Sequence, residues 1–266
     1  MPLWKWILCL LGGFLIFALL YAFAAGGVIA IPVPWVRMPV AVLAGLLGLF
    51  FYAVWTNLTE RRPVSELALK RTWKDLGLGL LTGLLFFGVV VGLMVLAGCY
   101  SITEAHLRLI PQISAFLYFF VVAVFEEIIF RGVLFRMIDD RWNTAVALII
   151  SALVFGFMHL PNQGATLWSS LAIAIEAGLL LGAAYKFTGT LWMPIGIHWA
   201  WNYTQGNVLG FAVSGNPVAD KVFSPIISGP DWMTGGVFGA EASVPAVVVG
   251  LLLTAVLLFN CKRDVR

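Results

Sequence analysis

Eight apolar stretches recur along this chain of 266 residues and constrain its fold more than any other feature. A helix rises 1.5 Å per residue, so about 20 residues are needed to cross the ~30 Å hydrocarbon core of a bilayer. The stretches near or above that length are 6–31, 38–58, 76–99, 111–135, 143–160, 166–185, 190–212 and 244–260. Hydrophobic residues make up 61% of the chain and charged residues only 11%, which excludes an ordinary soluble domain. The sequence therefore predicts an all-α, polytopic membrane helix bundle with about eight transmembrane helices.

The basic residues predict how this bundle is oriented in the membrane. If the eight stretches alternate in direction, one side receives twelve of the sixteen Lys and Arg residues and the other receives three, with Arg131 left inside a stretch. The larger group is Lys5, Arg61, Arg62, Lys70, Arg71, Lys74, Arg136, Arg141, Lys186, Lys262, Arg263 and Arg266, and the smaller group is Arg37, Arg108 and Lys221. Because basic loops stay in the cytoplasm, we expect both termini there. This topology accounts for the net charge of +3, so no nucleic-acid partner is predicted.

Ionisable residues divide the chain unevenly. Residues 1–110 supply three stretches without ionisable residues in their interiors, and residues 111–212 hold the conspicuous buried charges. Residues 213–266 contribute a Gly- and Pro-rich loop, 214–243, and the last stretch. We interpret these ranges as an N-terminal three-span region, a core that carries the site, and a long non-cytoplasmic loop with the last span, all within one membrane domain. The loop is long enough to cover or gate a site.

Two adjacent glutamates, Glu126 and Glu127, lie within the apolar stretch LYFFVVAVFEEIIFRGVLF. An uncompensated acidic residue at the centre of a membrane helix costs about 2.5–3.5 kcal/mol, so such residues usually carry function. Glu127 and Arg131 are four residues apart, share one helix face and can form a charge-assisted pair. Glu126 lies ~100° around the helix. We therefore predict that Arg131 neutralises Glu127 and that Glu126 is left free.

Two histidines and an asparagine extend this polar set. His198 and Asn202, in HWAWN, are four residues apart and point the same way. His159 ends its stretch because Pro161 disfavours continuation of the helix. Helix rise places Glu126, His198 and Asn202 about 12–20 Å from the cytoplasmic ends of their helices, with His159 slightly deeper. Two carboxylates, two imidazoles and an amide from three helices predict a hydrolytic or metal site.

Three alternatives stay open at this stage. Glu126, His159 and His198 would form a His-His-Glu set for zinc with one open position, and the same residues would also serve metal-free glutamate catalysis. Glu176 is either a partner of this site or an inward-facing structural group. A transporter is disfavoured, because the two halves of the chain show no matching broken helices.

Three short motifs connect these residues to a known family. The zinc motif HExxH, the serine loop GxSG and the aspartate motif GxGD are missing from the sequence. In their place the chain has EEIIFR at 126–131, FGFMH at 155–159 and HWAWN at 198–202, the last preceded by TGTLWMPIGIH. In these motifs and their order, the chain resembles the CPBP intramembrane proteases, which include the type II CAAX prenyl endopeptidases and abortive-infection proteins. The resemblance covers about residues 112–210, and the continuation NYTQGNVLGFAVSG is similar to a bacterial subset of the family.

The resemblance implies an endopeptidase that cleaves a membrane-associated protein or peptide, in the bacterial cytoplasmic membrane. The positions that match the family's functional residues are Glu126, Glu127, Arg131, His159, His198 and Asn202. We expect Glu126 and His159 to activate water, and His198 and Asn202 to stabilise the oxyanion. Glu127 and Arg131 would hold the helix of Glu126 in register. Family relationship leans toward a metallopeptidase, and a non-catalytic membrane immunity or scaffold protein that binds a membrane peptide is the alternative.

Overall fold

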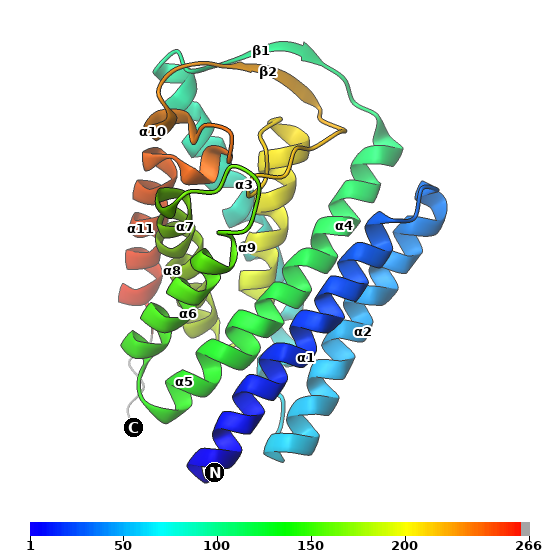
Figure 1. Cartoon of the computed structure of the whole chain (residues 1–266), viewed down its shortest axis with the longest axis vertical. Helices are drawn as coiled ribbons and strands as arrows, with labels where there is room; N and C mark the ends of the chain where they lie inside the picture. The colour runs from blue at the N-terminus through cyan, green and yellow to red at the C-terminus, as the bar shows by residue number, and fades with distance from the viewer. Residues whose placement is uncertain (262–266) are drawn as a thin grey trace.

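A computed structural model of the chain describes residues 1–261 and shows a bundle of long helices (Figure 1). The helices are α1 (Leu3–Ile29), α2 (Pro34–Glu60), α3 (Thr72–Leu96), α4 (Leu109–Glu127), α5 (Arg136–Arg141), α6 (Thr144–Met158), α7 (Leu167–Ile173), α8 (Leu179–Thr188), α9 (Trp192–Tyr203), α10 (Asp231–Thr234) and α11 (Val244–Phe259). Three π-helical segments continue them, η3 (Ile128–Phe135), η4 (Ala174–Gly178) and η5 (Thr204–Val208). The predicted all-α membrane bundle is confirmed.

The predicted count of eight spans is not confirmed. Within residues 1–261, five helices are long and apolar enough to cross a membrane: Leu3–Ile29, Pro34–Glu60, Ser65–Leu96, Leu109–Arg141 and Leu167–Thr188. Thr144–Met158 and Val244–Phe259 are apolar but shorter. The remaining predicted stretch, 190–212, contains α9 and η5, which together end at Val208. The predicted positions therefore all contain helix, but several helices are shorter than the apolar runs that contain them.

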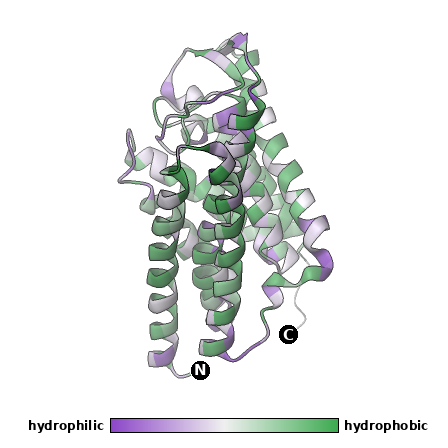
Figure 2. Cartoon of the chain, turned by 90° about the vertical axis from the view of Figure 1, so that its right-hand side faces the viewer, coloured by the Kyte–Doolittle hydropathy of each residue, from purple (hydrophilic) through white to green (hydrophobic). Residues whose placement is uncertain are grey.

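The outer surface of the bundle is apolar along the helices. On α1, the side chains of Leu8, Leu11, Leu15, Leu19 and Phe23 are all at least 60% exposed. Figure 2 shows hydrophobic residues along the length of the helices, with polar residues gathered mainly toward their two ends. Such a surface is stable against lipid tails. In water it would be unstable, because large exposed apolar patches favour association with other apolar surfaces. The protein is therefore an integral membrane protein.

Glycines bring α3 and α9 into close contact. A Cβ atom built on Gly79 would lie 2.3 Å from the carbonyl oxygen of Met193, and one on Gly83 would lie 2.3 Å from that of Ile197. On the facing helix, a Cβ on Gly196 would lie 2.5 Å from the carbonyl oxygen of Leu76. Small residues on membrane helices allow such close backbone approach. The packing fixes α9, which carries His198 and Asn202, against the N-terminal region of the chain.

A small sheet at the far end of the bundle departs from an all-helical arrangement. Strand β1 (Tyr100–Ala105) pairs antiparallel with β2 (Phe223–Ile227), and Figure 1 shows them at the end of the bundle opposite the start of α1. β2 lies in the predicted loop 214–243, which also contains α10 and the 3₁₀ turn η6 (Ala240–Ala242). The loop is therefore tied by backbone hydrogen bonds to the connection between α3 and α4.

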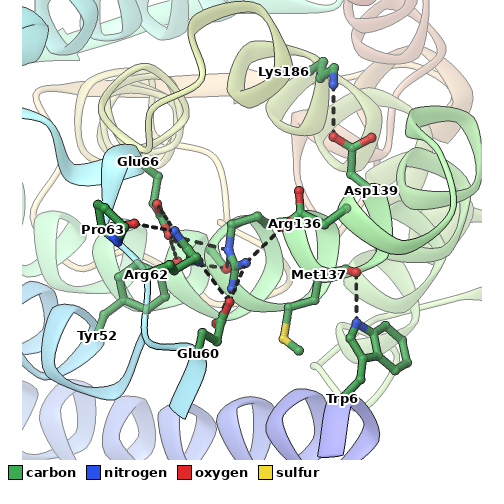
Figure 3. Close-up of polar contacts among 12 residues, drawn as sticks. Trp6, Tyr52, Glu60, Arg62, Pro63, Glu66, Arg136, Met137, Asp139 and Lys186 are labelled. Atoms are coloured by element: carbon green, nitrogen blue, oxygen red, sulfur yellow. Dashed lines mark hydrogen bonds and ion pairs between the residues drawn. The ribbon is translucent and has the colours of Figure 1, made fainter. Parts of the chain in front are cut away.

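Ion pairs hold the opposite end of the bundle together (Figure 3). Arg136 in α5 makes two hydrogen bonds to Glu60 at the end of α2, at 2.9 and 2.6 Å. Arg62 makes two to Glu66, at 2.9 and 2.6 Å, and Glu66 also accepts from the Tyr52 hydroxyl. Paired, two-point contacts of this kind are the strong form of an Arg–carboxylate interaction. Part of the basic cluster predicted to face the cytoplasm therefore also has a structural role.

The orientation of the bundle in the membrane stays a prediction. Figure 1 shows α11 running back toward the end at which α1 begins, as expected if both termini share one side. The turn η1 (Ser65–Leu67), which contains Glu66, and the turn η2 (Leu69–Arg71) connect α2 to α3 at this same end. Three of the basic residues used for the prediction, Lys262, Arg263 and Arg266, lie outside the described residues.

Candidate active site

The buried carboxylate of Glu127 joins two helices. Its Oε1 accepts a hydrogen bond from Nη1 of Arg131 at 2.9 Å and another from Nδ1 of His198 at 2.8 Å. Glu127 and Arg131 are completely buried in the bundle, and His198 is nearly so. The predicted pairing of Glu127 with Arg131 is present in the structure, and the contact with His198 adds a link from α4 to α9 that the sequence did not predict.

Arg131 is held by the backbone of a third helix. Its Nη2 donates to the carbonyl oxygens of Ala177 and Gly178 at 3.3 and 3.2 Å, and its guanidinium lies 4.7 Å from the centre of the Phe155 ring. A buried cation is stable only when its charge and its N–H groups are both matched. Arg131 therefore fixes α4 and η3 relative to η4, as well as neutralising Glu127.

Glu126 faces away from this pair and toward a cavity. Its Oε1 accepts a hydrogen bond from the hydroxyl of Tyr21 in α1 at 2.9 Å. Its Oε2 lies 3.7 Å from Nε2 of His198 and has no hydrogen-bond partner within residues 1–261. At 3.7 Å these two atoms are too far apart for a direct hydrogen bond. The separation of the two glutamates onto different faces agrees with the helical spacing.

His159 caps the end of α6 next to the break that Pro161 predicts. Its Nδ1 lies 2.8 Å from the carbonyl oxygen of Phe155, one turn earlier. Only a protonated ring nitrogen can bond to a carbonyl oxygen, so Nδ1 carries hydrogen and Nε2 is an acceptor in the neutral ring. The side chain is partly exposed and reaches the same cavity as Glu126.

His198 and Asn202 lie one turn apart on α9, as predicted, and both are about 6% exposed. The Asn202 amide makes no hydrogen bond to protein within the described part of the chain, residues 1–261. Both side chains line the cavity together with Glu126 and His159. Four of the six predicted site residues thus meet at one cavity, while Glu127 and Arg131 lie behind it.

The cavity has a volume of about 740 Å³. This is within the range of about 300–1,000 Å³ that small-ligand sites occupy. Its walls are mostly apolar and include Phe14, Val122, Ile129 and Phe130. Toward the end with the small sheet it is lined by the segment 213–220 of the long loop. Part of the loop therefore lines the cavity.

π-helical turns flank the site. The segment η3 follows directly after Glu127, η4 contains Glu176, and η5 begins two residues after Asn202. Each π turn accommodates an extra residue in an α-helix, at some cost in stability, and such turns are frequent at functional sites. They were not predicted, because their hydrophobic pattern is that of an ordinary helix.

The donor set has the chemistry that zinc requires. Both histidines have Nδ1 engaged and Nε2 available, a common arrangement for metal-binding imidazoles. Glu126 supplies a carboxylate oxygen on the same cavity. Within residues 1–261, however, no three His, Cys, Asp or Glu side chains lie close enough together to form a metal-binding group. The donor types fit, and the ligand sphere is not preassembled.

Tyr21, Ser214 and Glu241 are site residues that sequence reasoning missed. Tyr21 bonds to Glu126, and Ser214 lines the cavity and donates its backbone N–H to Glu241. A lone tyrosine in the apolar run of α1 was the one available signal for the first. Nothing in the spacing of the long loop indicated the other two.

Within this membrane bundle, the carboxylate of Glu126, the imidazoles of His159 and His198 and the amide of Asn202 line one cavity. Residues 108–204, a range that includes all six predicted site residues, match the family described as "Type II CAAX prenyl endopeptidase Rce1-like". This match confirms the predicted resemblance to the CPBP proteases over residues 108–204, and at the family level it supports a CAAX-protease-type intramembrane endopeptidase. The same comparisons found no match among curated proteins or solved structures.

Proposed function

We propose that this protein is an intramembrane endopeptidase that hydrolyses a peptide bond of a membrane-associated protein or peptide, with Glu126 as the general base. One observation carries the proposal: the carboxylate of Glu126, inside an apolar bundle, lines a cavity together with His159, His198 and Asn202, and one of its oxygens has no hydrogen-bond partner among residues 1–261. A carboxylate in the membrane interior costs free energy, and the carboxylates that occur there usually have a function.

The attacking water is bound between Glu126 and His159. Oε2 of Glu126 has no other partner among residues 1–261, and Nε2 of His159 is an acceptor because Nδ1 already donates to Phe155. Two acceptors orient a water so that its lone pair faces the substrate. The hydroxyl of Tyr21 holds the other oxygen of Glu126 and so fixes the direction of the carboxylate.

The oxyanion is bound by His198 and Asn202. His198 lies between two carboxylates, with Nδ1 on Glu127 and Nε2 facing Glu126, so its ring can donate from both nitrogens. The amide of Asn202, one turn further along α9, supplies a second donor. Fixed donors of this kind stabilise charge as it develops on the carbonyl oxygen.

Each proton in the reaction has a destination. Water attacks the scissile carbonyl carbon as Glu126 takes its proton, which forms a C–O bond and a tetrahedral oxyanion. Collapse of this intermediate restores the carbonyl and breaks the C–N bond, and Glu126 returns the proton to the leaving amine. Glu127 and Arg131 take no part in proton transfer and keep His198 in place.

A zinc ion is the second form of the proposal. Nε2 of His159, Nε2 of His198 and Glu126 would hold it, and a bound zinc would lower the pKa of its water. Elemental analysis of active, purified protein tests this form. Less than one metal ion per active site, with full activity in the presence of a strong chelator, rules it out.

Comparison of membrane peptides from cells with the wild-type protein and with Glu126→Gln tests the proposal directly. We expect one or more precursors to accumulate in the variant and their cleaved products to disappear, at equal protein abundance. If Glu126→Gln and His159→Ala both retain the biological effect without any change in the peptides, the protein binds its partner without cleaving it, and the proposal is wrong.

A further inference from the structure

A second, smaller cavity lies behind the wall of the site. It has a volume of about 20 Å³ and is lined by Glu176, Glu241, Asn202, His159, His198 and Ser214, among others. This volume is enough for one water molecule, provided that the water finds at least two polar partners. The side chain of Asn202 lines both this cavity and the main one.

Glu176 faces this second cavity. Its side chain is completely buried, and neither carboxylate oxygen has a hydrogen bond within the described residues, 1–261. The π turn η4 holds it there, and α11 packs so closely behind it that a Cβ on Gly250 would lie 2.7 Å from its Cα. The sequence of α11 contains no charged residue, so that side of Glu176 offers no counter-ion.

Glu241 approaches the same cavity from the long loop. It is 3% exposed, and its Oε1 accepts a hydrogen bond from the backbone N–H of Ser214. Burial raises the pKa of Glu241 to about 7, although the hydrogen bond from Ser214 opposes this shift. Two buried carboxylates that face one small cavity cannot both carry charge without a large cost.

The other charged groups around the cavity do not offset the repulsion between Glu176 and Glu241. The Nη2 atom of Arg131 is used by the carbonyl oxygens of the turn that follows Glu176, and the charge of Arg131 is matched by Glu127. His159 and His198 each have one ring nitrogen engaged elsewhere. A neutral, protonated Glu176 has a hydrogen to donate and needs no counter-ion.

We propose that Glu176, as a neutral acid, and Glu241 hold one buried water behind Asn202, and that this unit orients the Asn202 amide. The amide oxygen then accepts from the unit, and the NH₂ group is directed into the main cavity. Glu176 and Glu241 are positioning residues in this scheme. The role given to Asn202 rests on the proposed function, whereas the protonation of Glu176 and the bound water do not.

Infrared difference spectroscopy tests the neutral acid without any substrate. Spectra of the purified wild-type protein minus those of Glu176→Gln are expected to show the C=O stretch of a protonated carboxyl group at neutral pH. A difference that contains only carboxylate bands overturns the proposal. This result does not depend on whether the protein cleaves peptides.

A double-mutant cycle tests the route through Asn202, using a substrate identified from the membrane peptides. Glu176→Leu is expected to lower kcat by about tenfold or more with little change in KM, because the oxyanion donor acts only in the transition state. Glu176→Gln, which remains neutral and able to donate, serves as the matched control and should retain most of the activity. In the Asn202→Ala background, Glu176→Leu should have no further effect on kcat.

An equal loss of kcat in both backgrounds would show that Glu176 acts independently of Asn202 and would overturn the positioning role. If Glu176→Leu fails to fold, Glu176→Gln and the infrared spectra still decide the protonation state. If the wild-type protein cleaves nothing but the acid band is present, the proposed function fails and the buried acid stands.

Discussion

The Nδ1 atom of His198 and the Nη1 atom of Arg131 bond to the same oxygen of Glu127, at 2.8 and 2.9 Å. One carboxylate oxygen thus neutralises a buried cation and orients an imidazole from another helix. Its neighbour in sequence, Glu126, takes part in neither contact and instead faces the cavity. The adjacent glutamates therefore have different surroundings, and substitution should separate their effects.

Glu127→Gln is expected to lower the free energy of unfolding by about 3–5 kcal/mol, because it leaves the buried charge of Arg131 unmatched. Glu126→Gln, the matched control one residue away, should leave stability nearly unchanged and reduce cleavage by about 10²–10⁴-fold, as expected for loss of a general base. Thermal unfolding in detergent and a cleavage assay measure the two effects. Equal destabilisation by both variants would contradict the division of roles.

Tyr21→Phe should reduce kcat by about tenfold, since a hydrogen bond to a charged group contributes about 1.5–3 kcal/mol and here fixes the direction of the Glu126 carboxylate. Tyr118→Phe is the control, because Tyr118 lines the same cavity and makes no hydrogen bond to Glu126 within residues 1–261. Its kcat should stay within twofold of the wild type. Comparable losses in both variants would indicate a general effect on the cavity.

Gly83→Ala should destabilise the bundle by about 1–3 kcal/mol, because its Cβ would meet a backbone oxygen of Ile197 that cannot move independently. The displaced residue precedes His198, so cleavage should fall as well. Gly88→Ala, on the same helix, is the control, since a Cβ there has nothing within 4 Å among the described residues. Thermal unfolding of the two variants at equal detergent concentration decides whether close packing of α3 on α9 is required.

The stability of the protein should fall between about pH 4.5 and 7 through Glu241. Burial raises the pKa of this group from its ordinary value of 4.5 to about 7, so over this interval the folded state holds a proton that the unfolded state has lost. The stabilisation from Glu241 is complete below about pH 4.5 and is lost as the pH rises to about 7. Above that pH the free energy of unfolding no longer changes through this group. At about 1.4 kcal/mol per pKa unit, the loss approaches ~3 kcal/mol.

Glu241→Gln should remove most of this pH dependence, because an amide does not titrate. The midpoint of thermal unfolding at pH 5 and at pH 7.5 measures the effect in both proteins. The nearby titratable groups, Glu176, His159 and His198, remain in the variant and serve as the internal control. An unchanged slope in the variant would assign the dependence to them.

Much of the site could be predicted because its geometry follows from local spacing. Residues four apart on a helix share a face, which placed Glu127 with Arg131 and His198 with Asn202. Contacts between helices distant in the sequence could not be predicted in this way. The bond from Tyr21 to Glu126 spans 105 residues and that from His198 to Glu127 spans 71. No periodicity within one helix encodes such pairs.

The fold, like the site, was predicted where local sequence determines the structure and missed where distant segments meet. Apolar composition identified the helices, since each must satisfy its own backbone in lipid. It overestimated their length, because the residues at the ends of 143–160 and 190–212 belong to turns and irregular segments. The pairing of β1 with β2 depends on two loops more than 100 residues apart and has no local signature.

The π turns make the number of residues near the site as important as their identity. An α-helix advances by about 100° per residue, so removal of one residue from Ile128–Phe135 would rotate everything after it by that angle relative to Glu126 and Glu127. Arg136, which follows η3 directly, would then turn away from Glu60 at the end of α2. The eight residues of η3 thus set the rotation of Arg136, which pairs with Glu60 at the end of the bundle, relative to Glu126 and Glu127 in its interior.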